Sequence, residues 1–258
     1  MMGGSAKRMG TFAEVIAKAI GHPKKEMMEL DISKTDRFSF YKIGPVLSVN
    51  HGMGVPSVTI LLHEILKLLY YAEAKDPIIF RIGTCGGLGL SPGSVVITDK
   101  AVNAFLKEHH ETVILGKTIT RPAILDRDLA ESLLATQTDN TFNTLLGTTM
   151  CTDDFYEGQA RIDGVLCEHD EEDKQKYLEY INSQGVVNIE MEATAIASLC
   201  HRTGYRCAIV CVTLLDRLQG DQVDISQETY KKYQARPQEL IANFIKKRLR
   251  EDDIKEEI

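Results

Sequence analysis

One arginine lies inside an apolar run that ends in glycines. Residues 77–87 read PIIFRIGTCGG, which predicts a buried strand followed by a glycine-rich turn at Gly83, Gly86 and Gly87. A buried guanidinium stays protonated, so Arg81 needs an anionic partner. The glycines let the backbone approach a ligand, and Thr84 and free turn N–H groups can donate to an anion. Two interpretations stay open: an anion site, or a strand-end turn in which Arg81 pairs with a core carboxylate.

A second glycine-containing turn opens the chain. Gly3, Gly4 and Ser5 precede a helix that we expect from about Met9 to Ile20, with Arg8 beside its first turn. A helix N-terminus offers free N–H groups and partial positive charge, so this turn can cradle a phosphate. The alternative is a start without fixed structure, because nothing before the glycines anchors them.

Two further pairs of side chains could recognise a ligand. Gln159 and Arg161 lie two residues apart in a polar loop, so in an extended conformation both point the same way and match a planar edge of carbonyl and imide groups. The alternative is a solvated loop. Glu190 and Glu192 stand at the exit of a predicted buried strand, where carboxylates are costly unless something meets them, and a sugar diol is one such partner.

Composition limits the class of protein. The 258 residues are 43% hydrophobic and 26% charged, as in an ordinary soluble globular protein, and the net charge of −7 disfavours nucleic acid or an anionic membrane as a partner. The six cysteines show no CxxC spacing and are expected to be reduced core thiols in a cytoplasmic protein. The histidines are scattered, so we expect no metal site. No membrane-spanning run or signal peptide is predicted.

The elements that must position these residues alternate between strands and helices. Strands are expected at 44–50, 77–83, 93–102, 145–151, 186–190 and 206–215, and helices at 9–20, 56–71, 126–136, 170–183, 193–200 and 237–248. This order predicts one α/β domain with a mixed or mostly parallel central β-sheet flanked by helices. The candidate turns follow strand ends, which is where such sheets bind ligands.

These motifs together resemble the nucleoside phosphorylase-I family, and within it the animal-type uridine phosphorylases. The matching stretches are GGSAKRM, TDRFSFYKIGPVLSVNHGMGVPS, RIGTCGGLGLSPGSVVIT, TMCTDDFYEGQARIDG, NIEMEA and VCVTLLDRLQGDQ. The resemblance implies a single nucleoside phosphorylase domain over residues 1–258, with the family's first strand and N-terminal arm missing. It implies reversible phosphorolysis of uridine to uracil and ribose 1-phosphate in pyrimidine salvage. No cofactor is implied besides the co-substrate phosphate.

The resemblance also implies roles for individual residues. In a homodimer, Arg37 would enter the neighbour's site. The phosphate ligands would be Gly4, Arg8, Arg37, Arg81 and Thr84; the ribose ligands Thr84, Met191 and Glu192; the base ligands Phe155, Gln159, Arg161, Gly86, Leu214, Leu215 and Arg217; and the catalytic residues Arg81, Gln159, Arg161 and Glu192.

Two positions depart from the animal pattern. Cys85 replaces a serine near the base, and Asp216 replaces an asparagine at about the position where bacterial purine phosphorylases carry a proton-donating aspartate. Purine phosphorolysis is therefore an alternative, although Gln159, Arg161 and Leu215 favour uracil. A nucleoside hydrolase of the same fold would not need Arg8, Arg37 and Arg81 as a set. A catalytically silent nucleoside-binding paralogue is a further alternative.

Overall fold

A computed structural model describes residues 1–21, 33, 36–137 and 141–256. Its centre is an eight-stranded sheet in the order β10-β5-β8-β9-β4-β1-β3-β2. The strands are β1 Met2–Gly3, β2 Phe40–Ile43, β3 Val46–Asn50, β4 Ile78–Gly87, β5 Val95–Val102, β8 Thr144–Cys151, β9 Val186–Glu190 and β10 Arg206–Asp216. Parallel and antiparallel pairs both occur, so the predicted mixed sheet is confirmed.

A second pairing of β10 curls part of this sheet into a closed ring. β10 is antiparallel to β5 and also pairs in parallel with β4, from Arg206 opposite Ile78 to Asp216 opposite Gly87. The ring β10-β5-β8-β9-β4 closes through two residue pairs between β9 and β4. β4 and β10 therefore lie side by side along their whole length, and their carboxyl ends meet at one edge.

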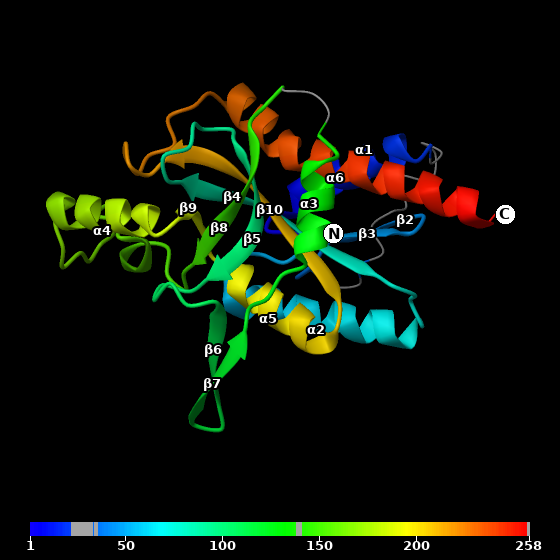
Figure 1. Ribbon diagram of the computed structural model, residues 1–258, viewed down its shortest axis with the longest axis horizontal. Coiled ribbons are helices and arrows are strands. Elements are labelled where there is room, and N and C mark those ends of the chain that lie inside the picture. Colours follow the sequence, from blue (N-terminus) through cyan, green and yellow to red (C-terminus); the bar gives the residue numbers. More distant parts are fainter. Residues whose placement is uncertain (22–32, 34–35, 138–140, 257–258) are drawn as a thin grey trace.

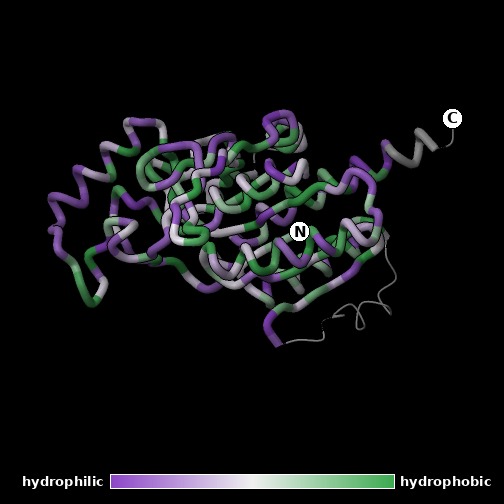
Figure 2. The backbone as a smooth tube through the Cα atoms, turned by 90° about the horizontal axis from the view of Figure 1, so that it is seen from below, coloured by the Kyte–Doolittle hydropathy of each residue, from purple (hydrophilic) through white to green (hydrophobic). Residues whose placement is uncertain are grey.

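Helices cover the sheet on both faces (Figure 1). They are α1 Ala6–Ala19, α2 Val55–Tyr71, α3 Arg127–Leu134, α4 Glu171–Ser183, α5 Ala193–Thr203 and α6 Gln227–Glu256. α1, α3 and α6 share one hydrophobic core with the sheet, and α2 and α5 share another with its opposite face. α4 packs against β9 through Leu178 and Ile181 at one end of the molecule. Most residues of α4 are hydrophilic, and they are coloured purple at the left of Figure 2.

The helices begin where the sequence offers a cap. At the start of α1 the Ser5 side chain accepts from the Arg8 N–H. In the same way, Asp126 accepts from the Leu129 N–H in α3, and Asp170 accepts from the Asp173 N–H in α4. α2 follows Gly54 at φ 81° and has a proline in its first turn, a position where a missing N–H costs nothing. α1 follows directly on β1, which is how the turn with Gly4 comes to lie at the carboxyl edge of the sheet.

The structure corrects two predictions about local structure, adds strands that the sequence did not predict, and decides one alternative that was left open. Gly83, Gly86 and Gly87 lie within β4, because β10 and β9 supply backbone partners for them. Helix α6 begins at Gln227 and includes Pro237 in its interior. Neither β2 nor the projecting hairpin of β6 His109–Ile114 and β7 Lys117–Pro122 was expected. The start of the chain is ordered: Met2 is buried in the sheet between β3 and β4.

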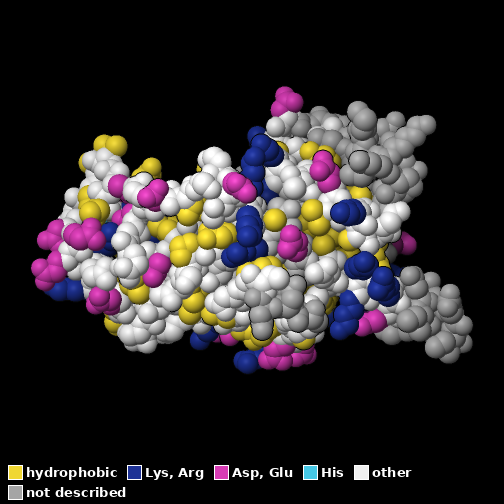
Figure 3. Space-filling model, turned by 90° about the horizontal axis from the view of Figure 1, so that it is seen from above, with side chains coloured by type: hydrophobic (Ala, Val, Ile, Leu, Met, Phe, Trp, Pro, Cys, Tyr) yellow, Lys and Arg dark blue, Asp and Glu magenta, His cyan; other side chains and the backbone are white. Residues whose placement is uncertain are grey.

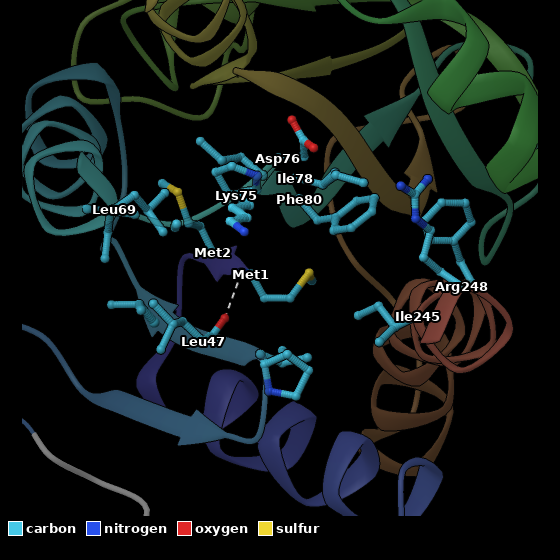
Figure 4. Close-up of a pocket in the computed structure, with 18 of the residues that line it drawn as sticks. Met1, Met2, Leu47, Leu69, Lys75, Asp76, Ile78, Phe80, Ile245 and Arg248 are labelled. Atoms are coloured by element: carbon cyan, nitrogen blue, oxygen red, sulfur yellow. Dashed lines mark hydrogen bonds between the residues drawn. The ribbon is translucent and has the colours of Figure 1, made fainter. Parts of the chain in front are cut away.

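A cavity of about 700 Å³ lies at the opposite edge of the sheet from the candidate turns (Figure 4). β1 pairs with Val49–Asn50 and Arg81–Ile82, and the earlier residues of β3 and β4 line this cavity together with Phe244 and Ile245 of α6. The terminal amine of Met1 donates to the Leu47 carbonyl at 2.7 Å, and burial lowers its pKa to about 5. None of the residues predicted to bind phosphate, ribose or base lines it.

The surface is mixed in charge. On the face in Figure 3, basic and acidic side chains are interspersed with hydrophobic ones. Among the described helices, none is both long and apolar enough to cross a bilayer. All six cysteines are free, and five of them are buried, which confirms that these five are core thiols.

Candidate active site

Arg81 is the centre of a buried ionic cluster. Its side chain is 4% exposed, and Nη1 lies 2.9 Å from Oε2 of Glu190, while Nη2 pairs with Oε2 of Glu192. Nη1 also donates to Sγ of Cys211 at 2.8 Å. The pairing of Arg81 with core carboxylates is thus observed, and both carboxylates are those that the sequence singled out.

The two glutamates are held differently. Glu190 ends β9 and accepts from the N–H groups of Glu192 and Ala193, at 2.9 and 2.8 Å, so it caps the start of α5. Glu192 accepts at Oε1 from the Gly54 N–H at 2.6 Å. Helix α5 and the loop before α2 therefore fix the Glu192 carboxylate from two sides.

The surroundings shift the pKa values of Glu190 and Glu192 in opposite directions. Burial raises the pKa of Glu190, and the Glu192 charge adds to that effect, although Arg81 opposes it. Burial acts the same way on Glu192, but Arg81, His51 and the Gly54 N–H outweigh it and lower the pKa of Glu192. Burial also opposes the charge on Arg81, yet Cys211 and both glutamates raise its pKa above the ordinary value. At neutral pH, Glu192 is thus the ionised partner of a permanently charged guanidinium.

Arg8 joins this cluster from α1. Burial lowers the pKa of Arg8, and the charge of Arg81 lowers it further, which places the two cations close enough to repel each other. The nearby Gly4 is packed so tightly that an added Cβ would lie 2.9 Å from the Gly52 carbonyl oxygen. Two guanidinium groups thus lie beside a tight glycine turn, and Glu190 and Glu192 pair with one of them.

The polar loop forms a second cluster. Arg217 is completely buried; its Nε donates to Oδ1 of Asp221 at 2.7 Å and its Nη2 to the Gln159 carbonyl at 2.7 Å. Nη1 of Arg161 donates to the Asp221 carbonyl at 3.0 Å. Lys174 of α4 adds an ion pair to Asp221 at 3.0 Å. Asp221 therefore holds both arginines in place, and Nε of Arg161 and Nη1 of Arg217 are buried without partners among the described residues.

Aromatic and apolar groups complete this second cluster. The Phe155 ring lies 4.2 Å from Cζ of Arg161 and is 44% exposed. Position 86 has no room for a side chain, because a Cβ added to Gly86 would lie 2.7 Å from Cγ of Arg217. Leu215 is buried and Leu214 half-buried at the end of β10. A flat polar ligand would meet donors at its edge and an aromatic ring at its face.

Thr152 connects the two clusters. Its N–H donates to the Glu190 carbonyl at 2.9 Å, and its hydroxyl accepts from Nε2 of Gln159 at 3.1 Å. The chain of contacts therefore runs from Gln159 through Thr152 and Glu190 to Arg81. A cationic site, a carboxylate and a polar planar site are thus joined in one continuous network.

Comparisons with known proteins agree with this geometry. A sequence model of the phosphorylase superfamily matches residues 1–246. The chain belongs to the phosphorylase superfamily. It is 51% identical to mouse uridine phosphorylase 1 over 251 residues, which are 96% of this chain and 80% of the mouse protein. It is 37% identical to the inactive uridine phosphorylase B of Schistosoma mansoni, over 95% of this chain and 82% of that protein.

The structural comparison gives the same family. The crystal structure of Schistosoma mansoni uridine phosphorylase in complex with uracil superposes with a TM-score of 0.89 at 39% identity, covering 95% of this chain and 85% of that one. The predicted fold, a mixed sheet flanked by helices, is therefore that of this superfamily.

Most of the residues expected in a superfamily site lie in the two clusters. Arg8, Arg81 and Glu192 share the first, and Gln159, Arg161, Arg217, Phe155 and Gly86 share the second. Met191, between the glutamates, and Thr84, three residues after Arg81, are half-buried. Arg37 is exposed, and its entry into a neighbour's site stays a prediction. The ligand roles of all these residues also stay predictions.

One geometric expectation was wrong. Gln159 and Arg161 do not share an extended segment: a 3₁₀ turn at Glu157–Gln159 is followed by Ala160 at φ 54°. The N–H groups of Gln159 and Arg161 both donate to the Tyr156 carbonyl. The turn, rather than strand alternation, sets their positions: the Gln159 carbonyl accepts from Arg217, and the Gln159 side chain donates to Thr152.

Sequence reasoning missed several residues of the site. Asp221 stands four residues after Arg217, a spacing that suits an ion pair. His51 follows a predicted strand directly, as the other candidate turns do. Thr152 and Cys211 carry no local signal, because only the pairing of distant strands places them here.

Proposed function

We propose that this protein catalyses the reversible phosphorolysis of uridine to uracil and ribose 1-phosphate. The observation that carries the proposal is the network from Gln159 through Thr152 and Glu190 to Arg81. This network supports the proposal because Gln159 could donate to a polar ring, Arg81 could bind an anion, and Glu192, which pairs with Arg81, could accept from a sugar.

The anion end supports attack by phosphate. Arg8 and Arg81 hold permanent positive charge, which offsets the repulsion that a phosphate dianion meets on an acidic protein. They would position one phosphate oxygen to form a bond to the anomeric carbon as the bond from that carbon to the uracil nitrogen breaks. The ionised Glu192 would accept from the ribose hydroxyls, an interaction that can strengthen as the sugar gains oxocarbenium character.

The base end supports departure of uracil. The leaving ring takes the electron pair of the broken bond and becomes negative until it is protonated. Arg161, Arg217 and the Gln159 amide would donate to its carbonyl and imide edge, and donors aimed at such developing charge are typically worth about 3–4 kcal/mol each. The partnerless Nε of Arg161 and Nη1 of Arg217 are available donors within the described structure.

The remaining assignments complete the proposal. The relative from Schistosoma mansoni was solved with uracil, which supports a pyrimidine base as the ligand. Phosphate is the only co-substrate and no cofactor takes part. The protein would act in the cytoplasm in pyrimidine salvage, as a homodimer in which Arg37 enters the neighbour's phosphate site.

The purine alternative receives no support from Asp216. Its Oδ1 accepts from the N–H groups of Gly89 and Leu218 at 3.0 and 3.1 Å. These contacts make the carboxylate a turn cap after β10, in agreement with a structural rather than a proton-donating role.

One experiment separates the candidate activities. The protein is incubated with uridine with and without inorganic phosphate, and uracil release is followed by chromatography. Uracil that appears only with phosphate supports the proposal. Release without phosphate would indicate a hydrolase, and no release would indicate a silent nucleoside-binding protein. Inosine in place of uridine tests the purine alternative.

A further inference from the structure

His51 is a buried histidine whose polar atoms are unused within the described structure. It is 1% exposed, and neither Nδ1 nor Nε2 has a hydrogen-bond partner among the residues that the structure describes. Leaving buried polar atoms unpaired is costly, of the order of 1–3 kcal/mol each, and such groups in native proteins usually meet a ligand, an ion or water. The ring therefore faces something that the described residues do not supply.

The backbone of His51 is firmly placed. Its N–H donates to the Gly3 carbonyl at 2.8 Å, and its carbonyl accepts from the Ser57 hydroxyl in the first turn of α2. Gly52 and Gly54 on either side of Met53 both have positive φ, so the loop turns sharply and presents the Gly54 N–H to Glu192. His51 thus belongs to a built loop between the Gly4 turn and the glutamate cluster.

The charged groups around the ring are those of the first cluster. Burial lowers the pKa of His51 to about 4, and the charges of Arg81 and Arg8 lower it as well, against Glu192. The Gly52 backbone lies near and favours the protonated ring without completing a hydrogen bond to it. A neutral imidazole in this position carries one N–H donor beside two guanidinium groups. An anion with many acceptor oxygens suits these three donors together.

We infer that His51 is a further ligand of the phosphate co-substrate and donates one hydrogen bond from its neutral ring to a phosphate oxygen. The inference rests on the proposed function, because it assigns the anion that Arg8 and Arg81 attract. A neutral donor suits a nucleophile, since it orients the oxygen while withdrawing less electron density than a third cation would. His51 would then hold the phosphate on the side of the Gly4 turn.

The first test compares three variants of the full chain by steady-state kinetics in both substrates. His51→Leu removes the donor, His51→Gln keeps an N–H donor, and His63→Leu removes an exposed histidine of α2 as the control. We expect His51→Leu to raise the KM for phosphate by about 10- to 100-fold, His51→Gln to raise it less, and neither to change the KM for uridine comparably. An unchanged KM for phosphate, or a larger effect on the KM for uridine, would overturn the assignment.

The second test needs no turnover, and it uses a variant only to assign signals. The wild-type protein, labelled with ¹⁵N in its histidines, is titrated with inorganic phosphate in the absence of nucleoside. The His51 ring signals, assigned by their loss in His51→Gln, are expected to shift in step with phosphate occupancy. Ring signals that stay fixed at saturating phosphate would refute the inference. This readout does not depend on uracil release. A failed phosphorolysis assay would therefore contradict the proposed function without deciding whether His51 binds phosphate.

Discussion

Nη1 of Arg81 lies 2.9 Å from Oε2 of Glu190, in a site where both side chains are almost fully buried. The guanidinium that we assign to phosphate is therefore also the counter-ion of a structural carboxylate and, through Nη2, of Glu192. Under the proposed function, this one residue serves both stability and substrate binding, so its replacement should affect both.

Arg81→Ala should abolish phosphorolysis and lower the free energy of unfolding by about 3–5 kcal/mol, because two buried carboxylates lose their cation. Urea unfolding and uracil release measure the two effects. The double variant Arg81→Ala/Glu192→Gln should regain part of the stability but none of the activity. An Arg81→Ala protein as stable as the wild type would contradict the role of the ion pairs.

Arg161→Ala should reduce turnover of uridine by about 100- to 1,000-fold while the KM for phosphate changes little, because the donor lies at the base end of the network. Steady-state kinetics in both substrates give these values. Arg127→Ala, which removes an exposed arginine of α3, is the matched control and should behave as the wild type. If the KM for phosphate rose by as much as turnover fell, the assignment of Arg161 to the uracil ring would be contradicted.

Asp216→Ala should lower the free energy of unfolding by about 1 kcal/mol, because the Gly89 and Leu218 N–H groups lose their acceptor. Asp216→Asn retains an acceptor oxygen and should keep both the stability and the uridine turnover. The assays are chemical unfolding and uracil release. If Asp216→Asn removed an activity toward inosine that the wild type possessed, the carboxylate would be a proton donor instead of a turn cap.

His51 should make the protein less stable as the pH falls from about 6.5 to about 4. The unfolded chain binds a proton near the ordinary histidine pKa, whereas the pKa of folded His51 is about 4, so within this window the unfolded state holds more protons. Relative to His51→Gln, the wild type should lose about 3 kcal/mol between pH 7 and pH 4. Unfolding at a series of pH values measures the difference. Parallel curves for the two proteins would show that the ring is not held neutral by its burial and by the charges of Arg81 and Arg8.

The sequence predicted the fold where local signals were strong. Period-2 and period-3.6 patterns located β9 at its exact bounds and α2, α4 and β8 within a residue. The sequence did not predict the structure where a segment is shaped by strands that are distant in the chain. The glycines of β4 look like a turn in isolation, and only β10 and β9 alongside make them a strand. The hairpin β6–β7 is polar and largely exposed, so it carries little hydrophobic pattern.

The site was predictable in its residue types more than in its contacts. A buried arginine requires an anion, and Glu190 and Glu192 require a cation, but no spacing indicates that they meet each other. Their meeting depends on β4 and β9 lying adjacent in the sheet. The role of Asp221 in holding Arg161 and Arg217 depends in the same way on a fold that returns the chain to the polar loop.

Phosphate-dependent release of uracil from uridine by the wild-type protein tests the central claim most directly. We predict that uracil forms only when inorganic phosphate is present, in amounts equal to the ribose 1-phosphate produced, and that Arg81→Ala forms none. Uracil release at the same rate without phosphate, or no release under any condition, would contradict the account.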